Sequence, residues 1–509
     1  MNGRKLIIAA AFLLSCWNAT FASVRTRAQQ SVTSSLNSEP FRSGVCAVLA
    51  VRMNGDTLVS INPRQKLVPA STTKLITTGI GLKVLGADYR YSTSLGYSGT
   101  IKDSTLVGDL YIMGGGDPTT GSRSKCSEPS KQLFAKWQSL LLNAGIRRIE
   151  GRIIGDPRFF DDPCAQSTGW SNEDLGCNYG AGPTGLNFFE NAQNFYVTPG
   201  AAPGVRPFIS PRYPETPWMQ YCVSATTGAP RTENSLWYVT SRFGPYGEFF
   251  GSFPADRRGY TLECSNPFGA YTCAFHFYKH LNANGITCTG GYGDVSPQGY
   301  IRTDLQFSSI GRRAAARKEL AVIGRTCSPA LKDIVADTNA ESDNFFAETI
   351  FRTVGLTLEG SSRQDSCVAA IERELAALGL RTVNSCRVYD GSGLSRKNYI
   401  SPGFFVAFLR AMVRTSVFPE FFASLPVPGQ VNSTLETRFR EAPRELKDRI
   451  HMKSGSMNGV RCFSGYITTP DADPRHTVVF CVMTNNVTAT SPTAMPVIED
   501  IIAAIAAEN

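Results

Sequence analysis

Histidine is scarce in this sequence, and closely spaced cysteine pairs are missing altogether. The 509 residues include four histidines and 14 cysteines, and no two of the cysteines form a CxxC pair. His276 and His280 have the spacing of one helix face, but no second pair of ligands follows at the separation that zinc sites need. We therefore expect no metal ion and no cofactor.

Concentrated charge of one sign is absent too. The net charge is +9, but the basic residues are spread along the chain and form no stripe with interleaved aromatic residues. A nucleic-acid partner is therefore not expected. Two interpretations of the charge stay open: an ordinary soluble basic protein, and attraction to an anionic envelope polymer or membrane surface.

Long apolar runs are also missing, apart from a short one near the N-terminus. Two basic residues precede the apolar stretch 6–14, which is too short to span a bilayer comfortably and is typical of an export signal. Cleavage after Ala22 would make residues 1–22 a signal peptide. Alternatively, the residues before Cys16 resemble a lipobox, so that the signal would end at residue 15 and a lipid on Cys16 would attach the protein to a membrane. Because 14 cysteines suit an oxidising compartment, we expect a periplasmic protein or, alternatively, a membrane-tethered lipoprotein.

The rest of the chain divides by composition. Residues 23–40 are polar and are interpreted as a tether. Residues 91–317 are dense in glycine, proline, threonine and aromatic residues, which predicts a β-rich region of two modules with one helix at 130–144. The flanking segments mix helical and strand patterns. They predict one domain formed from residues 41–90 and 318–509, with the β-rich region inserted in it.

The first chemical motif is the SxxK pattern of Ser71 and Lys74, at the start of an apolar helix that we expect over residues 71–85. Residues three apart share a helix face, so the lysine amine reaches the serine hydroxyl. A serine nucleophile needs an adjacent base, and we expect burial and the charge of Lys453 to lower the pKa of Lys74 toward that role. The same pattern recurs at Ser122 in a polar turn, so this motif alone is weak.

The second motif is Ser-x-Asn, formed by Ser342 and Asn344 at the start of another expected helix. A serine here has an ordinary structural role as a helix cap. In a functional interpretation, its hydroxyl relays a proton between Lys74 and a leaving amine, and the Asn344 amide holds a substrate carbonyl group.

The third motif is Lys453-Ser454-Gly455-Ser456 at the end of a short expected strand. Lys453 and the Ser454 hydroxyl would bind a terminal carboxylate, and Gly455 would let a substrate backbone lie against the strand edge. The backbone N–H of Ser456 would join that of Ser71 in an oxyanion hole. Taken alone, a lysine at a strand end is equally common without any such role.

Together the motifs match the signature of β-lactamases and penicillin-binding proteins. With its flanking segments, the chain from about residue 40 onward resembles the class C, low-molecular-mass penicillin-binding proteins, which are D-alanyl-D-alanine carboxypeptidases and endopeptidases. The flanking segments that carry the resemblance are 107–118, 151–156, 390–396 and 459–467. The resemblance implies an α/β (α+β), β-lactamase-like serine peptidase domain, a five-stranded antiparallel sheet flanked by helices, with β-rich domains inserted between SxxK and SxN. It also implies that peptidoglycan stem peptides are cleaved through an acyl-enzyme on Ser71, which β-lactam antibiotics inhibit covalently.

The resemblance further implies residues that bind the third residue of the stem peptide. These are Arg396, Asn458 and an aspartate of the inserted region, which we match to Asp156. Two positions depart from the family pattern. Ser454 replaces the usual threonine but keeps the hydroxyl, and Asn458 stands where a glutamine is familiar, which puts the side-chain preference in doubt.

Two alternative functions stay open. A β-lactamase uses related motifs, although its chain has no place for a long insertion. A catalytically inactive scaffold would use the inserted modules to dock on peptidoglycan.

The cysteines give one further pair of expectations. Cys367 precedes an expected helix over residues 368–378, and Cys386 follows in a return strand, so we predict a disulfide between them that closes a loop of about twenty residues. Three other cysteines lie in apolar strands and are expected to be core thiols: Cys46, Cys462 and Cys481.

Overall fold

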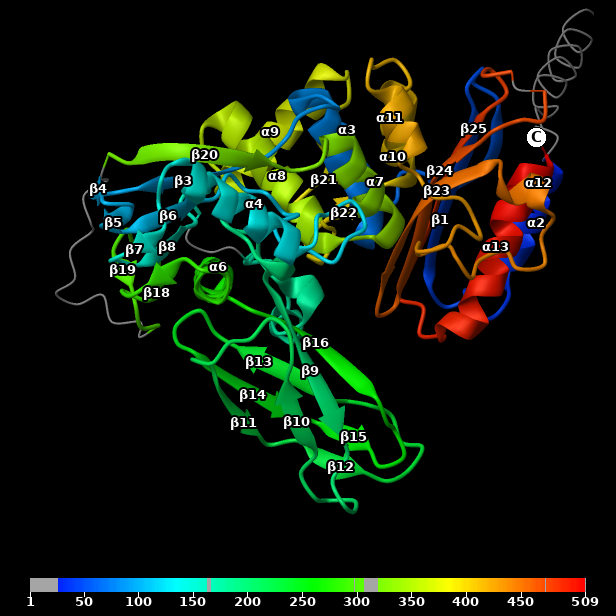
Figure 1. Ribbon diagram of the computed structural model, residues 1–509. Coiled ribbons are helices and arrows are strands. Elements are labelled where there is room, and N and C mark those ends of the chain that lie inside the picture. Colours follow the sequence, from blue (N-terminus) through cyan, green and yellow to red (C-terminus); the bar gives the residue numbers. More distant parts are fainter. Residues whose placement is uncertain (1–25, 163–165, 297, 306–318, 472, 509) are drawn as a thin grey trace, which may run out of the picture.

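The computed structural model describes residues 26–162, 166–296, 298–305, 319–471 and 473–508 (Figure 1). The predicted export signal, including Cys16, lies outside these residues. Within them, none of the helices combines the length and the apolar character that crossing a bilayer requires.

The central sheet joins the two ends of the chain. Its strands are β1 (Val45–Arg52), β2 (Thr57–Ile61), β23 (Ile450–Met457), β24 (Val460–Ile467) and β25 (Val478–Asn485). They are ordered β2-β1-β25-β24-β23, and all neighbours are antiparallel. β1 pairs with β25 over its full length, and β23, which carries the third motif, lies at the edge. These findings confirm the five-stranded antiparallel sheet that the resemblance implied.

Successive residues of β1 face two different cores, as the period of a strand requires. Cys46 and Val48 pack on the side of helices α2 (Arg27–Asn37) and α13 (Ser491–Ala507). Ala47 packs on the opposite side, against the helices that carry the first two motifs. Figure 1 shows α2 and α13 on one face of the sheet and the larger group of helices on the other.

Helix α2 shows that the interpretation of residues 23–40 as a tether was wrong. Ala28, Val32 and Leu36 recur every four residues and are buried in the core shared with α13. The Thr26 hydroxyl caps the helix by accepting a backbone N–H of the first turn at 2.9 Å. A stripe of three apolar residues scarcely alters the polar composition of the segment, which is why composition alone concealed the helix.

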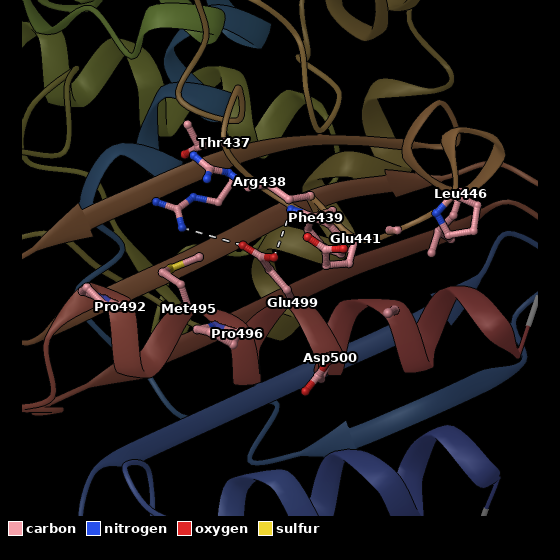
Figure 2. A pocket seen from close by; sticks show the side chains of 14 residues that line it. Thr437, Arg438, Phe439, Glu441, Leu446, Pro492, Met495, Pro496, Glu499 and Asp500 are labelled. Carbon is pink, nitrogen blue, oxygen red and sulfur yellow. Dashed lines mark hydrogen bonds and ion pairs between the residues drawn. The ribbon is translucent and has the colours of Figure 1, made fainter.

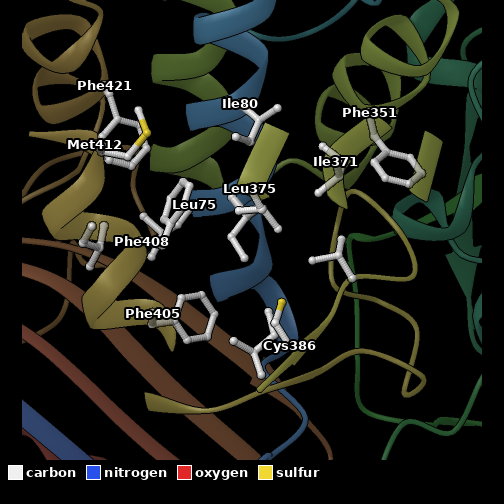
Figure 3. Packing of buried hydrophobic residues seen from close by; sticks show 14 of the residues in the cluster. Leu75, Ile80, Phe351, Ile371, Leu375, Cys386, Phe405, Phe408, Met412 and Phe421 are labelled. Atoms are coloured by element: carbon white, nitrogen blue, oxygen red, sulfur yellow. The ribbon is translucent and has the colours of Figure 1, made fainter. Parts of the chain in front are cut away.

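The helical layer surrounds α3. Its members are α3 (Lys74–Leu85), α7 (Leu331–Glu341), α8 (Asn344–Glu359), α9 (Gln364–Ala377), α10 (Pro402–Met412) and α11 (Phe418–Ala423). Figure 3 shows Leu75 and Ile80 of α3 packed among Phe408 of α10 and Leu375 of α9. The first nine residues of α3 are buried, so its N-terminal end is fixed firmly in place. Short elements complete this part of the chain: β21 (Cys386–Arg387), β22 (Tyr399–Ile400) and α12 (Arg444–Lys447).

The inserted region leaves and re-enters the peptidase part through two paired strands. β3 (Ser92–Tyr97) and β20 (Ala321–Cys327) are antiparallel neighbours, so the two ends of the insertion lie close together. They belong to a six-stranded sheet with β6 (Leu110–Met113), β8 (Ile153–Asp156), β18 (Tyr292–Val295) and β19 (Ile301–Arg302). A four-stranded sheet lies beside it, formed by β4 (Thr100–Lys102), β5 (Thr105–Val107), β7 (Arg148–Ile149) and β17 (Thr287–Cys288).

Two long helices pack on these sheets. α4 (Ser130–Asn143) matches the helix that the sequence predicted, whereas α6 (Gly269–Ala283) was not foreseen. α6 contains aromatic and threonine residues of modest helix propensity, including Tyr271 and Phe277. Both are buried against neighbouring elements, so tertiary packing outweighs the local preference.

The second part of the insertion is a β-module that projects away from the rest of the molecule (Figure 1). Its strands are β9 (Ala192–Thr198), β10 (Phe208–Pro211), β11 (Gln220–Val223), β12 (Thr226–Gly228), β13 (Trp237–Thr240), β14 (Tyr246–Phe250), β15 (Ser252–Pro254) and β16 (Tyr260–Ser265). They form three small sheets, ordered β10-β9-β16, β11-β14-β13 and β12-β15. Phe195, Tyr238 and Phe249 lie in their shared core.

A loop covers part of α13 on the side of the sheet away from α3 (Figure 2). Residues 437–446 and α13 enclose a surface cavity of about 700 Å³. Glu499 of α13 fixes the loop, because it accepts the backbone N–H of Phe439 at 2.9 Å and lies 3.7 Å from Arg438. Phe439 has a left-handed φ of 51° and is buried, so this hydrogen bond restrains a strained turn.

The cysteine predictions had mixed outcomes. Cys367 and Cys386 are buried free thiols, so the predicted disulfide is wrong. The Cys367 thiol instead faces Gly355 of α8 and lies 3.4 Å from the carbonyl oxygen of Ser362. The prediction of core thiols is confirmed, since all three lie buried in the central sheet: Cys46, Cys462 and Cys481.

Candidate active site

Ser71 lies in a single 3-10 turn, η1 (Ala70–Thr73), that leads directly into α3. Two side chains hold the turn: Thr72 Oγ1 donates to the carbonyl oxygen of Pro69 at 2.6 Å, and Thr73 Oγ1 donates to that of Ala70 at 2.9 Å. Ala70 has a left-handed φ of 48°, an uncommon conformation for a non-glycine residue. The turn thus presents a partly exposed serine at the end of a buried helix.

Lys74 contacts the serine and two further oxygen atoms. Its Nζ lies 3.0 Å from Ser71 Oγ, 2.6 Å from Asn344 Oδ1 and 2.8 Å from the carbonyl oxygen of Ser392. The amide and carbonyl oxygens can only accept hydrogen bonds. A neutral amine has two N–H groups, which these two oxygens satisfy, so its lone pair is left directed at the Ser71 hydroxyl. The contacts therefore favour a base at this position.

Burial lowers the pKa of Lys74 from 10.5 to about 8, because the side chain is fully inaccessible to solvent. Asp343, Asp390 and Glu348 oppose the shift through their charges. The charge of Lys453, which we expected to lower this pKa, is not among the causes of the shift. Repulsion between the two amines instead adds to burial in lowering the pKa of Lys453 well below its usual value.

The second motif lies where α7 ends and α8 begins. Ser342 has a left-handed φ of 62° and terminates α7, whereas Asp343 caps α8 by accepting the backbone N–H of Phe346 at 2.8 Å. The capping role considered for Ser342 therefore belongs to its neighbour. Asn344 binds Lys74 through its oxygen and donates from Nδ2 to the carbonyl oxygen of Tyr179, in the insertion, at 2.9 Å.

The third motif lies on β23 beside the serine turn. A Cβ atom at Gly455 would lie 3.0 Å from the backbone nitrogen of Ser71 and 2.7 Å from the carbonyl oxygen of Pro69, so only glycine permits this approach. Lys453 is fully buried, and its Nζ donates to the carbonyl oxygen of Ser454 at 2.8 Å. The Ser454 hydroxyl lies 2.7 Å from that of Thr434.

A cavity of about 820 Å³ opens in front of Ser71, between the peptidase part and the inserted region. Five of the predicted residues line it: Ser71, Asn344, Arg396, Ser456 and Asn458. The inserted region supplies six more: Glu173, Asp174, Cys177, Tyr179, Ser235 and Trp237. Arg396 Nη2 donates to the carbonyl oxygen of Asn458 at 3.2 Å, which joins two of the residues that the family resemblance implied.

Asp156 lies elsewhere, and this match was wrong. It ends β8 and binds Arg158 in bidentate fashion, at 2.8 Å to Nε and 2.6 Å to Nη2. The acidic residues that line the cavity are Glu173 and Asp174 of the short helix α5 (Asn172–Leu175). Sequence reasoning missed them because a single helical turn has no periodicity, although two adjacent acidic residues shortly after a tryptophan were visible.

A buried carboxylate organises the loop that contacts Lys74. Asp390 accepts hydrogen bonds from the backbone N–H groups of Gly393 at 2.9 Å and Ser395 at 2.6 Å, and from Asn398 Nδ2 at 2.8 Å. A fourth donor, Trp170 Nε1 at 2.8 Å, comes from the inserted region. Asp390 therefore connects the insertion to the loop whose Ser392 carbonyl group binds the lysine, a connection that sequence reasoning did not find.

In the part of the chain that the structure describes, no group of three or more histidine, cysteine, aspartate or glutamate side chains is arranged to hold a metal ion. The site instead combines a serine hydroxyl, a buried amine and an edge strand with exposed backbone groups. Such a set suits nucleophilic acyl transfer, in which a base activates the serine and backbone N–H groups stabilise the oxyanion.

Comparisons with known proteins agree with this chemistry. The sequence model of the D-Ala-D-Ala carboxypeptidase 3 (S13) family matches residues 28–509. A D-alanyl-D-alanine carboxypeptidase from Actinomadura sp. (strain R39) is 27% identical over 498 residues, which cover 95% of this chain and 85% of that protein. Penicillin binding protein 4 (dacB) from Haemophilus influenzae has a similar structure, with a TM-score of 0.76, 21% identity, and coverage of 92% of this chain and 97% of that one. A second structure of that protein, in complex with a novel β-lactam, gives a TM-score of 0.70 at 19% identity and covers 93% of this chain and 98% of that one.

Proposed function

The chain belongs to the D-Ala-D-Ala carboxypeptidase 3 (S13) family, and from this membership we propose that it is a serine-type D-alanyl-D-alanine carboxypeptidase that also cleaves peptidoglycan cross-links as a D,D-endopeptidase. The observation that carries the proposal is the environment of Lys74. Its amine lies 3.0 Å from the Ser71 hydroxyl, and burial lowers its pKa to about 8. A buried lysine without a catalytic role would have no reason to keep this contact.

In the proposed first step, Ser71 Oγ attacks the D-alanyl carbonyl carbon and its proton passes to the neutral amine of Lys74. The backbone N–H groups of Ser71 and Ser456 stabilise the oxyanion. The C–N bond then breaks, and the leaving amine receives the proton from Lys74 through the Ser342 hydroxyl. A water molecule then attacks the ester carbonyl carbon of the acyl-enzyme and gives its proton to Lys74. The bond to Ser71 Oγ breaks, the serine takes back the proton, and the shortened peptide leaves.

Substrate binding is proposed to involve both sides of the cavity. Lys453 and the hydroxyl of Ser454 bind the terminal carboxylate of the substrate. One wall of the cavity carries the Arg396 guanidinium and the Asn458 amide. The other wall carries the carboxyl group of Asp174, whose pKa is raised by burial. Walls of opposite charge suit a third residue that carries both an amino and a carboxylate group.

We further propose the remaining properties that the sequence predicted. Residues 41–90 and 318–509 form the peptidase domain, and residues 91–317 form an insertion. The structure suggests two adjustments to these bounds, because β20 pairs with β3 in the sheet of the insertion and α2 packs in the core of the peptidase part. The protein is exported to the periplasm by its N-terminal signal, with lipidation of Cys16 as the alternative. β-Lactams acylate Ser71, a proposal supported by the β-lactam complex of the Haemophilus influenzae protein.

The test uses the purified chain with a D-Ala-D-Ala pentapeptide, a cross-linked muropeptide and a fluorescent penicillin. We expect release of D-alanine, cleavage of the cross-link and a stable penicillin adduct on Ser71. Ser71→Ala should abolish all three. The matched control is Ser122→Ala, because Ser122 has the same SxxK spacing but its hydroxyl binds Glu190 in the insertion.

Other outcomes would contradict the proposal. An adduct mapped to a different serine would rule out Ser71 as the nucleophile. Hydrolysis of penicillin within seconds would favour a β-lactamase, and a wild-type protein that neither cleaves peptide nor is acylated would favour an inactive scaffold.

A further inference from the structure

Trp237 brings an aromatic ring from the β-module into the cavity that contains Ser71. It begins β13, and 38% of its surface is exposed. Its ring stacks on that of Phe250 of β14, with a centroid distance of 5.1 Å and an interplanar angle of 29°. Because ligand cavities are commonly lined by aromatic side chains, a large, partly exposed ring in the cavity of Ser71 offers a contact surface to a ligand.

The position of this ring is fixed by the packing of the module. The next residue, Tyr238, is buried in the module core, so the alternation of a strand directs Trp237 outward. β13 also abuts the end of α5, where a Cβ atom at Gly176 would collide with the carbonyl oxygen of Tyr238. Ser265 of β16 reinforces the junction by donating its backbone N–H to the carbonyl oxygen of Gly176 at 2.9 Å. Trp237 is therefore held beside the acidic helix that lines the cavity.

From this geometry we propose that Trp237 forms a sugar subsite, which stacks against a pyranose ring of the glycan strand that carries the stem peptide. The inference rests on the proposed function. The charged walls of the cavity suit the peptide, but a broad aromatic face needs a flat, weakly polar partner. Alanine methyl groups are too small to cover an indole ring. The C–H bonds on one face of a pyranose ring carry partial positive charge, which complements the negative face of the indole.

The subsite would select substrates that are attached to glycan. The test compares kcat/KM for a stem pentapeptide alone with kcat/KM for the same peptide on its disaccharide. We expect the wild-type enzyme to favour the disaccharide form. Trp237→Ala should lower this preference up to about tenfold, the usual contribution of one aromatic contact. The loss should appear chiefly in KM, and Trp237→Phe should restore part of the preference. The matched control is Tyr246→Ala, since Tyr246 is an exposed aromatic residue of the same sheet that lines a different cavity.

The outcomes separate this proposal from the proposed function. If the wild-type enzyme cleaves neither substrate, the peptidase assignment fails. If Trp237→Ala reduces activity on both substrates by the same factor, the ring contacts the peptide or supports the wall, and the sugar subsite is rejected. An unchanged preference in Trp237→Ala, or an equal loss in Tyr246→Ala, would also overturn it.

Discussion

The peptidase part and the inserted region contribute different kinds of side chain to the site around the cavity. Behind the Ser71 wall, the peptidase part places Lys74 and Lys453, both fully buried and both with a lowered pKa. The insertion supplies Asp174, Tyr179 and Trp237, which are all partly exposed. Burial adjusts the reactivity of an ionisable group, whereas exposure makes a group available to variable parts of a substrate. We infer that the chemistry and the selectivity are divided between the two regions.

The division is not complete, because hydrogen bonds and an ion pair join the regions. Trp170 of the insertion donates to Asp390, and the carbonyl oxygen of Tyr179 accepts from Asn344. Away from the cavity, Arg352 of α8 pairs with Asp162 of the insertion at 3.0 Å. Predictions that alter one region at a time can therefore show how far each depends on the other.

The largest expected effect is on activity, from a change in the peptidase part. Lys74→Arg keeps the positive charge but cannot lose it at ordinary pH, so acylation should fall about 1000-fold or more. Steady-state kinetics and the rate of penicillin labelling measure the effect. The matched change in the insertion is Lys125→Arg, in the second SxxK pattern, which should leave both rates unaltered. Substantial activity in Lys74→Arg would rule out the base role.

The second prediction concerns stability. The pKa of Lys74 is 10.5 when unfolded and about 8 when folded, so the unfolded state binds more protons between these values and stability rises with pH there. Below pH 8 the full cost of burying the charged lysine applies, and it amounts to about 3 kcal/mol, or about 300-fold in the folding equilibrium. Lys74→Met should therefore be inactive but more stable than the wild type at pH 7, by up to this amount less the lost hydrogen bonds.

Urea denaturation at several pH values tests this. The stability gained by Lys74→Met should shrink as the pH rises through 8 toward 10.5. Lys131→Met, an exposed change on α4 of the insertion, should alter stability by less than about 0.5 kcal/mol at any of these pH values. If Lys74→Met is less stable than the wild type at pH 7, burial of the lysine does not destabilise the fold.

The sequence predicted the peptidase part better than the insertion, and the reason is physical. SxxK works within one helical turn, and KxG lies on one strand, so their chemistry depends on local geometry that spacing reveals. The sequence also predicts a hairpin over residues 45–61, because Asn54-Gly55 between two apolar runs is a turn signal. The strands β1 and β2 form this hairpin. Apolar periodicity likewise predicts helices over residues 402–415 and 495–507. The helices α10 and α13 lie at these positions, with ends within four residues of the predicted ones.

The failures share the opposite property, since they depend on contacts between distant segments. Asp156 has the expected residue type, but a neighbouring arginine binds it, and Asp174 reaches the cavity only because α5 docks on β13. The link from Trp170 to Asp390 spans 220 positions and leaves no local signal. The resemblance to a known family supplied the five-stranded sheet, which spacing alone did not.

The third prediction is the pH dependence of acylation, an effect of about tenfold per pH unit. Lys74 must be neutral to accept the serine proton, and its pKa is about 8. The rate should therefore fall as the pH drops below 8 and level off above it. In Asp390→Asn, the pH at which the rate begins to fall should be lower, because the carboxylate raises the pKa of Lys74. If that pH does not change, Asp390 acts on the lysine only through the loop.

The smallest expected effect tests whether the insertion supports the catalytic loop. Trp170→Phe keeps an aromatic ring but removes the N–H that Asp390 accepts at 2.8 Å. Three other donors still satisfy the carboxylate, so the loop should loosen rather than unfold, and acylation should slow about threefold at most, given the usual contribution of one hydrogen bond. The loss should appear in kcat, because the Ser392 carbonyl group that positions Lys74 would be held less firmly. The matched control is Trp218→Phe, since its buried Nε1–H has no hydrogen-bond partner among the residues that the structure describes. If both variants slow acylation equally, the hydrogen bond from Trp170 gives the catalytic loop no specific support, and the insertion acts on the site through its other contacts or through the substrate.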